Sequence, residues 1–169
     1  APVSQLRSVC DLLRRMGGNV VFDEEHDRLL VDTDEKRRIK NIPFVETGVY
    51  PEFPTDLQSP LLACACVSGG ELVLKERIFS SRFKVVEELV RMGADIAVLD
   101  DESVRVRGVE KLEGRTVIAR ELRGGAALVI AGLAAKGITT VADIRYIRRG
   151  YQDIVGDLKG LGARISYVD

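Results

Sequence analysis

The sequence predicts a mixed α/β fold in which helices and small sheets form layers. Segments with a helical spacing of apolar residues alternate with short strand-like runs along the chain. Glycines follow several of the helical segments, where the left-handed backbone that glycine adopts closes a helix. The same order of elements also returns along the chain. This alternation is typical of layered sheet-and-helix structure and not of helical bundles or β-sandwiches.

The apolar spacing places the elements in order. The first helix is expected over residues 4–16, because Leu6, Val9, Leu12, Leu13 and Met16 share one helical face and Gly17-Gly18 follow. A later helix is expected to open at Arg82-Phe83, bury Val85, Val86, Leu89 and Val90, and end at Gly93. The remaining helices are expected over 56–67, 125–136 and 151–161, with strands over 19–22, 28–31, 42–49, 72–75, 96–98, 104–106, 116–119, 139–144 and 164–168, and a charged connection over 34–40.

Two kinds of internal repeat organise these elements. Residues 13–20, 89–96 and 158–165 each combine a helix end, a glycine stop and a strand start. A second repeat, with an offset of 67 residues, aligns the helix over 57–67 with the helix near 125–135 and places Asp56 on Arg123. The chain is therefore interpreted as a single partial domain, 1–169, with units near 1–49, 50–119 and 120–169. The first unit lacks its opening helix and strand, so a longer parent protein is expected.

Composition narrows the class of function. The chain of 169 residues has a net charge of −1, which gives no global attraction to nucleic acid or to a membrane surface. Its apolar runs are too short to span a bilayer, and Ala1-Pro2-Val3 does not resemble a signal peptide. Three cysteines in apolar surroundings suit a reducing compartment, so a soluble cytoplasmic protein is expected.

Asp56 is the first candidate for chemistry. Two prolines at 51 and 54 stiffen the lead-in, and Thr55 with Gln58 has the spacing of a capping box, which predicts Thr55 as the N-cap of the helix. One reading makes Asp56 a first-turn acid that complements the helix dipole. The other makes it a working group that accepts a proton or a hydrogen bond from a substrate hydroxyl.

A basic segment provides the other candidates. Arg123 precedes Gly124-Gly125 at the start of an apolar helix, where exposed backbone N–H groups could hold an anion, although a solvated arginine beside a flexible turn is the simpler reading. Between 115 and 149 the basic residues outnumber the acidic ones seven to two, which indicates a phosphorylated or carboxylated ligand. Arg145, Arg148 and Arg149 close this segment, and Arg82 holds an equivalent place one unit earlier.

The cysteines and the histidine carry little functional signal. Cys64 and Cys66 are two apart within a predicted helix and therefore face different directions, so they cannot chelate one metal together. With Cys10, they are interpreted as small core residues. His26 lies in an acidic turn, and the glycines lack the spacing of a nucleotide-binding loop.

Several strings together resemble the enolpyruvyl transferase family, over nearly the whole chain. They are residues 53–56 (Phe-Pro-Thr-Asp), 82–83 (Arg-Phe), 91–95 (Arg-Met-Gly-Ala-Asp), 122–128 (Leu-Arg-Gly-Gly-Ala-Ala-Leu), 129–135 (Val-Ile-Ala-Gly-Leu-Ala-Ala) and 149–151 (Arg-Gly-Tyr). The resemblance implies repeated βαβαββ units that form part of an inside-out barrel, with helices inside and sheets outside. It covers only the C-terminal part of the family's usual chain.

The resemblance implies an activity and its site. The members most like this chain transfer enolpyruvate from phosphoenolpyruvate to the 3'-hydroxyl of UDP-N-acetylglucosamine, an early step of peptidoglycan synthesis and so of cell-wall biogenesis, cell shape and cell division. They release phosphate and need no metal or organic cofactor. By position, Asp56 matches the proposed catalytic base that contacts the sugar hydroxyl, and Ile78 matches a residue that touches the nucleotide sugar. Arg123 and Arg149 match arginines of the cleft, and Arg82 is included as a further substrate-binding residue.

The chain also departs from the family pattern. The family's N-terminal lysine and loop cysteine have no counterpart here, so the isolated chain is expected to be inactive without the N-terminal part of the enzyme as its partner. Arg148 stands where the family usually has Asp, Ser80-Ser81 where it has Glu-Asn, and Gln152 where Glu is common. Two alternatives remain open: the shikimate-pathway enolpyruvyl transferase, which acts on 3-phosphoshikimate, and a non-catalytic ligand-binding or regulatory module.

Overall fold

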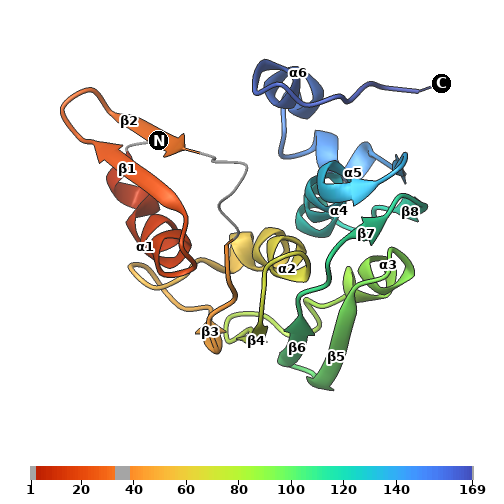
Figure 1. The fold of residues 1–169 in the computed structure, drawn as a ribbon, viewed down its shortest axis with the longest axis horizontal. Coiled ribbons are helices and arrows are strands. Elements are labelled where there is room, and N and C mark those ends of the chain that lie inside the picture. The colour runs from red at the N-terminus through yellow and green to blue at the C-terminus, as the bar shows by residue number, and fades with distance from the viewer. Residues whose placement is uncertain (1–2, 33–38, 169) are drawn as a thin grey trace.

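A computed structural model describes residues 3–32 and 39–168 (Figure 1). Helices and short strands alternate through most of it, which confirms the mixed α/β class. The helices are η1 (Val3–Leu6), α1 (Arg7–Arg15), η2 (Thr55–Leu57), α2 (Gln58–Cys66), α3 (Val86–Arg91), α4 (Leu122–Ala134), α5 (Arg145–Arg148) and α6 (Ile154–Gly160). The strands are β1 (Asn19–Asp23), β2 (Arg28–Asp32), β3 (Phe44–Glu46), β4 (Glu71–Lys75), β5 (Asp95–Asp100), β6 (Ser103–Arg107), β7 (Leu112–Glu113), β8 (Thr116–Ile118), β9 (Ala135–Lys136) and β10 (Thr140–Ala142).

The largest sheet has the strand order β3-β4-β6-β5. Strands β3 and β4 are parallel and are joined through α2, whereas β4, β6 and β5 pair antiparallel. From β3 to β6 the chain therefore runs strand, helix, strand, helix, strand, strand, the order that the family resemblance implied. Further along, β8 and β10 form a second parallel pair joined through α4. Within the described residues no sheet closes into a barrel, so the inside-out barrel stays a prediction.

The core lies around α2 and α4, which pack against each other. Helix α2 is apolar on almost every side and also contacts β4 and β6 of the large sheet. Strands β4 and β6 turn alternate residues towards it, as expected for a sheet with one covered face. In Figure 1 the α1–β1–β2 unit and the α6 end lie on opposite sides of this centre.

The glycine stops predicted from the repeats are confirmed. Gly17, Gly93 and Gly162 follow α1, α3 and α6 with φ angles of +95°, +94° and +91°. At the offset of 67 residues, Gly70 and Gly137 share φ angles of +90° and +92°. These angles lie in the left-handed region, which an L-residue with a Cβ enters at a cost. The repeated sequence therefore encodes a repeated backbone conformation. The boundaries of the three units remain a prediction.

The local structure differs from the expectations at several places. Helix α3 begins at Val86 instead of Arg82, and Val90 lies 45% exposed instead of in the core. The short helix α5 was not predicted. Residues 164–168, expected as a closing strand, pair with no strand in the described chain, and a strand needs such a neighbour for its backbone hydrogen bonds. Most of the predicted connection over 34–40 lies outside the described residues.

Candidate active site

Asp56 lies in η2, the single turn that leads into α2. The preceding Pro54 is extended, and the side chain of Asp56 is 61% exposed. The predicted capping box is wrong: the Thr55 hydroxyl donates to the carboxylate of Glu76 at 2.8 Å, and no side chain caps the turn. Gln58 is buried and accepts a hydrogen bond from Ser59. Thr55 is therefore held by tertiary structure, and Asp56 is displayed beside it.

Arg123 meets Asp56 directly. Its Nε and one terminal nitrogen both lie 2.5 Å from Oδ1 of Asp56. The two residues are equivalent in the repeat, and packing of α2 on α4 brings the starts of both helices together. An ion pair this exposed contributes roughly 0.2–1 kcal/mol to stability. The fold therefore does not depend on this ion pair. The pair does hold a carboxylate and a guanidinium in contact at one place on the surface.

The start of α4 differs from what the glycines suggested. The Glu121 carboxylate accepts hydrogen bonds from the backbone N–H groups of Arg123, at 2.9 Å, and Gly124. The expectation that these N–H groups are open to an anion is therefore wrong, because the chain's own carboxylate occupies them. The glycines allow close approach instead: a Cβ on Gly124 would collide with the Glu121 carboxylate and lie 3.2 Å from Val85, and one on Gly125 would lie 2.7 Å from Ile147.

The connection between β4 and α3 carries two more of the predicted residues. Ile78 is 38% exposed. The guanidinium of Arg82 lies 4.3 Å from the centre of the Phe79 ring, a cation–π contact that holds the arginine against its own loop. Val85, three residues further on, touches Gly124. This connection therefore borders the start of α4, near the Asp56–Arg123 pair.

Arg149 approaches the same helix start from another side. It ends α5, and the following Gly150 packs against the side chain of Leu122. Of the three clustered arginines, Arg145 pairs with Asp143 at 2.9 Å and Arg148 lies over the ring of Tyr167 at 5.2 Å. Arg149 is exposed and makes no ion pair or ring contact with any residue in 3–32 or 39–168.

Sequence reasoning missed Glu76, which the structure places just beyond β4. It is 1% exposed and accepts hydrogen bonds from Thr47, Thr55 and the backbone N–H groups of Ile78 and Phe79. A signal was present: Leu72, Leu74 and Glu76 alternate with period two, so the glutamate occupies a core position of the strand pattern. A carboxylate at such a position predicts a set of buried donors.

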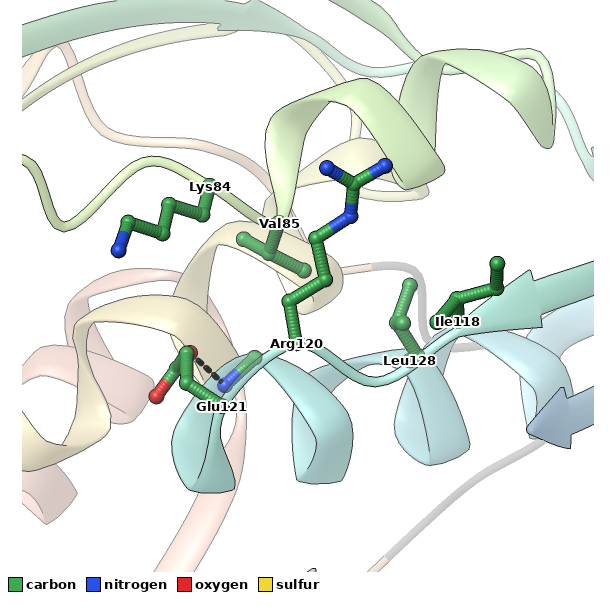
Figure 2. Close-up of a pocket in the computed structure, with 7 residues that line it drawn as sticks. Lys84, Val85, Ile118, Arg120, Glu121 and Leu128 are labelled. Atoms are coloured by element: carbon green, nitrogen blue, oxygen red, sulfur yellow. Dashed lines mark hydrogen bonds between the residues drawn. The ribbon is translucent and has the colours of Figure 1, made fainter. Parts of the chain in front are cut away.

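A small pocket adjoins the site (Figure 2). Lys84, Val85, Ile118, Arg120, Glu121, Gly124 and Leu128 line it, and Arg120 reaches from the β8–α4 connection towards α3. Arg120 pairs there with Glu87 at 3.2 Å. The pocket holds about 10 Å³, room for one water molecule. Sites for small-molecule ligands usually measure about 300–1,000 Å³, so this hollow cannot enclose a sugar nucleotide.

The thiols take no part in the site. Burial raises the pKa values of Cys10 and Cys64, and burial followed by the neighbouring Cys64 raises the pKa of Cys66 to about 12. All three remain unpaired and protonated at neutral pH; Cys10 and Cys66 are buried as expected for core residues, whereas Cys64 is only partly buried. Among the described residues, no group of three His, Cys, Asp or Glu side chains could hold a metal ion. No helix there is long and apolar enough to cross a bilayer.

The family can now be stated. Residues 2–158 match the sequence model of the EPSP synthase (3-phosphoshikimate 1-carboxyvinyltransferase) family. Because this match covers most of the chain, the protein belongs to that family, the enolpyruvyl transferases. The family predicted from the sequence is confirmed.

Two curated relatives carry the same enzyme name. UDP-N-acetylglucosamine 1-carboxyvinyltransferase of Finegoldia magna is 40% identical over 169 residues, which cover 98% of this chain and 38% of that enzyme. UDP-N-acetylglucosamine 1-carboxyvinyltransferase 1 of Legionella pneumophila is 48% identical over 125 residues, which cover 74% of this chain and 24% of that enzyme. The chain thus spans between a quarter and two-fifths of these relatives.

Solved structures agree on the fold. The enolpyruvyl transferase NikO of Streptomyces tendae matches 98% of this chain with a TM-score of 0.83 and 30% identity, over 37% of its own length. EPSP synthase of Acinetobacter baumannii matches 85% of this chain, over 34% of its own, with a TM-score of 0.60 and 14% identity. The second likeness concerns the fold alone. No comparison assigns a role to Asp56, Ile78, Arg82, Arg123 or Arg149, which remain predicted site residues.

Proposed function

We propose that this chain forms one wall of an active site that transfers enolpyruvate from phosphoenolpyruvate to the 3'-hydroxyl of UDP-N-acetylglucosamine. The observation that carries the proposal is the Asp56–Arg123 pair at the shared start of α2 and α4. In the reaction the hydroxyl oxygen bonds to C2 of the enolpyruvyl group, and phosphate leaves. The proton of the hydroxyl needs an acceptor, and Asp56 is exposed and held in place for this role.

The other residues take roles that their positions allow. Ile78 offers an exposed apolar surface to the nucleotide sugar. Arg149 is exposed and pairs with no residue in the described part of the chain, and Arg82 is held beside Phe79, so both can bind the carboxylate or the phosphate of phosphoenolpyruvate in the bidentate manner of arginine. The reaction needs no metal or organic cofactor, and no membrane or nucleic acid takes part. Three unpaired thiols fit a cytoplasmic enzyme of cell-wall synthesis.

A second wall is required. The pocket beside α4 is far too small for a sugar nucleotide, and the chain spans 38% of the Finegoldia magna enzyme. We therefore propose that the remaining part of an enolpyruvyl transferase, including the family's lysine and cysteine, closes the cleft over Asp56 and Arg123. The 169-residue chain by itself should not turn over. It should bind UDP-N-acetylglucosamine weakly or undetectably, and sub-micromolar affinity in calorimetry would contradict this.

The test is a hybrid enzyme in which this chain replaces the matching part of the Finegoldia magna enzyme. Phosphate release from phosphoenolpyruvate should depend on added UDP-N-acetylglucosamine, and Asp56→Ala should lower kcat by about 100-fold or more because the proton acceptor is lost. Asp95→Ala removes an equally exposed, ion-paired aspartate on β5 and is the matched control. Near-normal turnover in Asp56→Ala would mean that Asp56 is not the proton acceptor and only complements the helix dipole.

The same assay separates the alternatives. Turnover with 3-phosphoshikimate, and none with the sugar nucleotide, would show that the acceptor belongs to the shikimate-pathway enzyme. Binding of UDP-N-acetylglucosamine to a folded hybrid without phosphate release would favour a non-catalytic ligand-binding module. The relatives at 40–48% identity carry the name of the sugar-nucleotide enzyme, which is why that acceptor is expected.

A further inference from the structure

Glu76 joins three separate segments of the chain at one buried point. Its Oε1 accepts hydrogen bonds from Thr47 at 2.9 Å and from the backbone N–H groups of Ile78 and Phe79 at 2.7 and 3.1 Å. Its Oε2 accepts from Thr55 at 2.8 Å. Thr47 follows β3, Thr55 lies in η2 beside Asp56, and residues 77–79 follow β4. Four donors from three segments therefore converge on one carboxylate.

The direction of these hydrogen bonds is fixed. The Thr47 hydroxyl accepts the backbone N–H of Arg77 at 2.9 Å, so its own proton points to Glu76. The two backbone N–H groups of the loop can only donate. Glu76 is therefore surrounded by donors, which suits a side chain that accepts at both oxygens. Burying a carboxylate is costly unless donors satisfy both of its oxygens, and here four donors do so.

Two candidate site residues depend on this point. The turn that displays Asp56 is tied to Glu76 through the neighbouring Thr55. The loop that displays Ile78 is tied to Glu76 through the backbone of Ile78 itself. The first tie is long-range, because Thr55 lies 21 residues before Glu76, whereas the second is local, because Ile78 lies two residues after it. Without the carboxylate, each segment would be free to move relative to the other.

We propose that Glu76 is a positioning residue that locks the turn bearing Asp56 to the loop bearing Ile78, so that the proton acceptor and the contact to the nucleotide sugar are held as one rigid unit. The inference rests on the proposed function for its catalytic consequence, but its structural part stands independently. Glu76 touches neither substrate nor reacting atoms. It acts by fixing the distance between the residue that holds the acceptor sugar and the residue that removes its proton.

The structural part is tested on the 169-residue chain by amide hydrogen exchange. Glu76→Ala should lower the protection of the Ile78 and Phe79 amides by about tenfold or more, because both lose their acceptor. The Val73 amide, which donates to Pro43 at 3.0 Å, should stay protected and shows that β4 is intact. Unchanged protection at Ile78 and Phe79 would overturn the inference.

Glu76→Gln is the conservative variant. Its amide oxygen can take the place of Oε1 and keep three donors, and its NH₂ group then faces the Thr55 hydroxyl, which can rotate to accept. Protection at Ile78 should therefore be largely restored. A loss as large as that of Glu76→Ala would mean that the donors do not hold the loop in the way described.

The catalytic part is tested in the hybrid enzyme by a double-mutant cycle with Asp56→Asn. Glu76→Ala should lower kcat/KM roughly tenfold to hundredfold when Asp56 is present, the loss expected from removing hydrogen bonds to a charged group. In the Asp56→Asn background the loss should fall below about threefold, because the acceptor that Glu76 positions is gone. Glu88→Ala is the control: Glu88 is equally buried and holds the Ile118 amide at 3.3 Å, but it has no tie to Asp56. The loss of kcat/KM caused by Glu88→Ala should be the same with and without Asp56→Asn, so that the two losses multiply.

A milder variant covers the case in which Glu76→Ala does not fold. Thr55→Val removes only the hydroxyl next to Asp56, and Thr55→Ser retains it. Thr55→Val should lower kcat with the same dependence on Asp56 while the Ile78 amide stays protected, and Thr55→Ser should recover most of the loss. Equal activity of the two variants would show that the Thr55–Glu76 hydrogen bond does not position Asp56, and the inference would be wrong.

The outcomes separate this inference from the proposed function. An inactive hybrid with all its residues unsubstituted would count against the proposed function, and amide exchange would still decide whether Glu76 holds the loop. An active hybrid in which the losses from Glu76→Ala and Asp56→Asn simply multiply would leave the function standing. In that case Glu76 would be a structural residue only, and the inference would be wrong.

Discussion

The starts of α2 and α4 occupy equivalent places in the repeat but are built differently. At the offset of 67 residues, Pro54 corresponds to Glu121 and Asp56 to Arg123. Both cap positions are extended, yet only Glu121 caps its helix with a side chain. The two start sites therefore share a backbone plan and differ in side-chain function.

The difference shows how a repeated scaffold becomes an asymmetric site. At the start of α4 the Glu121 carboxylate caps the backbone N–H groups, and Gly124 and Gly125 leave room for Val85 and Ile147 to pack closely. The start of α2 has no side-chain cap, and Asp56 is left displayed. The ion pair between the two starts then joins the displayed acid to a base from the closed side.

The largest effect is expected from exchanging the charged pair. Asp56→Arg combined with Arg123→Asp restores an ion pair, so the double variant should match the parent's stability to within about 1 kcal/mol in urea unfolding. Its turnover in the hybrid enzyme should nevertheless stay about 100-fold or more below that of the unsubstituted hybrid, because the proton acceptor has moved to the wrong helix start. Recovered turnover would mean that the two starts are interchangeable.

A smaller effect is expected from filling the start of α4. Gly125→Ala places a methyl group 2.7 Å from Ile147 and 3.0 Å from Ala119. Overpacking of this kind costs about 1–3 kcal/mol, seen as a lower midpoint in urea unfolding. Gly160→Ala, with nothing within 4 Å of the new atom, is the control and should be neutral or stabilising. Equal effects at both glycines would remove the packing explanation.

A loss of about 1 kcal/mol is expected from removing the cap of α4. Glu121→Ala leaves the N–H groups of Arg123 and Gly124 without their acceptor. Glu121→Gln retains an amide oxygen and should lose less. At the other start, Thr55→Ala should destabilise through the lost bond to Glu76, with no loss of helix capping, so helical circular dichroism should not change before unfolding. A frayed α2 in that variant would show that Thr55 does cap.

The last prediction concerns the far ends of the two helices and leaves stability unchanged. Cys66 on α2 corresponds to Leu133 on α4, which is 45% exposed. Because the pKa of Cys66 is raised to about 12, its thiol should react with iodoacetamide at pH 8 about a thousandfold more slowly than the thiol introduced by Leu133→Cys. Comparable rates, followed by mass spectrometry, would show that the end of α2 opens.

Much of the fold could be predicted because local rules decided it. The left-handed glycines after α1, α3 and α6 follow from helix termination, and the two hairpins follow from alternating apolar residues across polar turns. Residues 164–168 have the same alternation but pair with no strand among the described residues, which a local pattern cannot reveal. Val90 was placed in the core by spacing, but it is 45% exposed near the end of α3.

The site was predictable only as separate residues. The repeat aligned Asp56 with Arg123, but their contact depends on how α2 packs against α4. Thr55 has the sequence of a cap, yet Glu76, 21 residues away, captures its hydroxyl. Glu121 was overlooked because glutamate is not among the preferred capping residues. For Asp56 and Thr55 a long-range partner replaced the local one that the sequence offered, whereas Glu121 is a local cap of an unusual residue type.

The side-by-side start of α2 and α4 has an electrostatic consequence. The N-terminal end of every helix carries a partial positive charge, so two helices that begin together bring two such charges close and repel each other there. The carboxylates of Asp56 and Glu121 lie at this point and offset the repulsion. The repeat thus creates a focus of positive potential by its geometry, and the residue chosen at each helix start determines how much of that potential is neutralised.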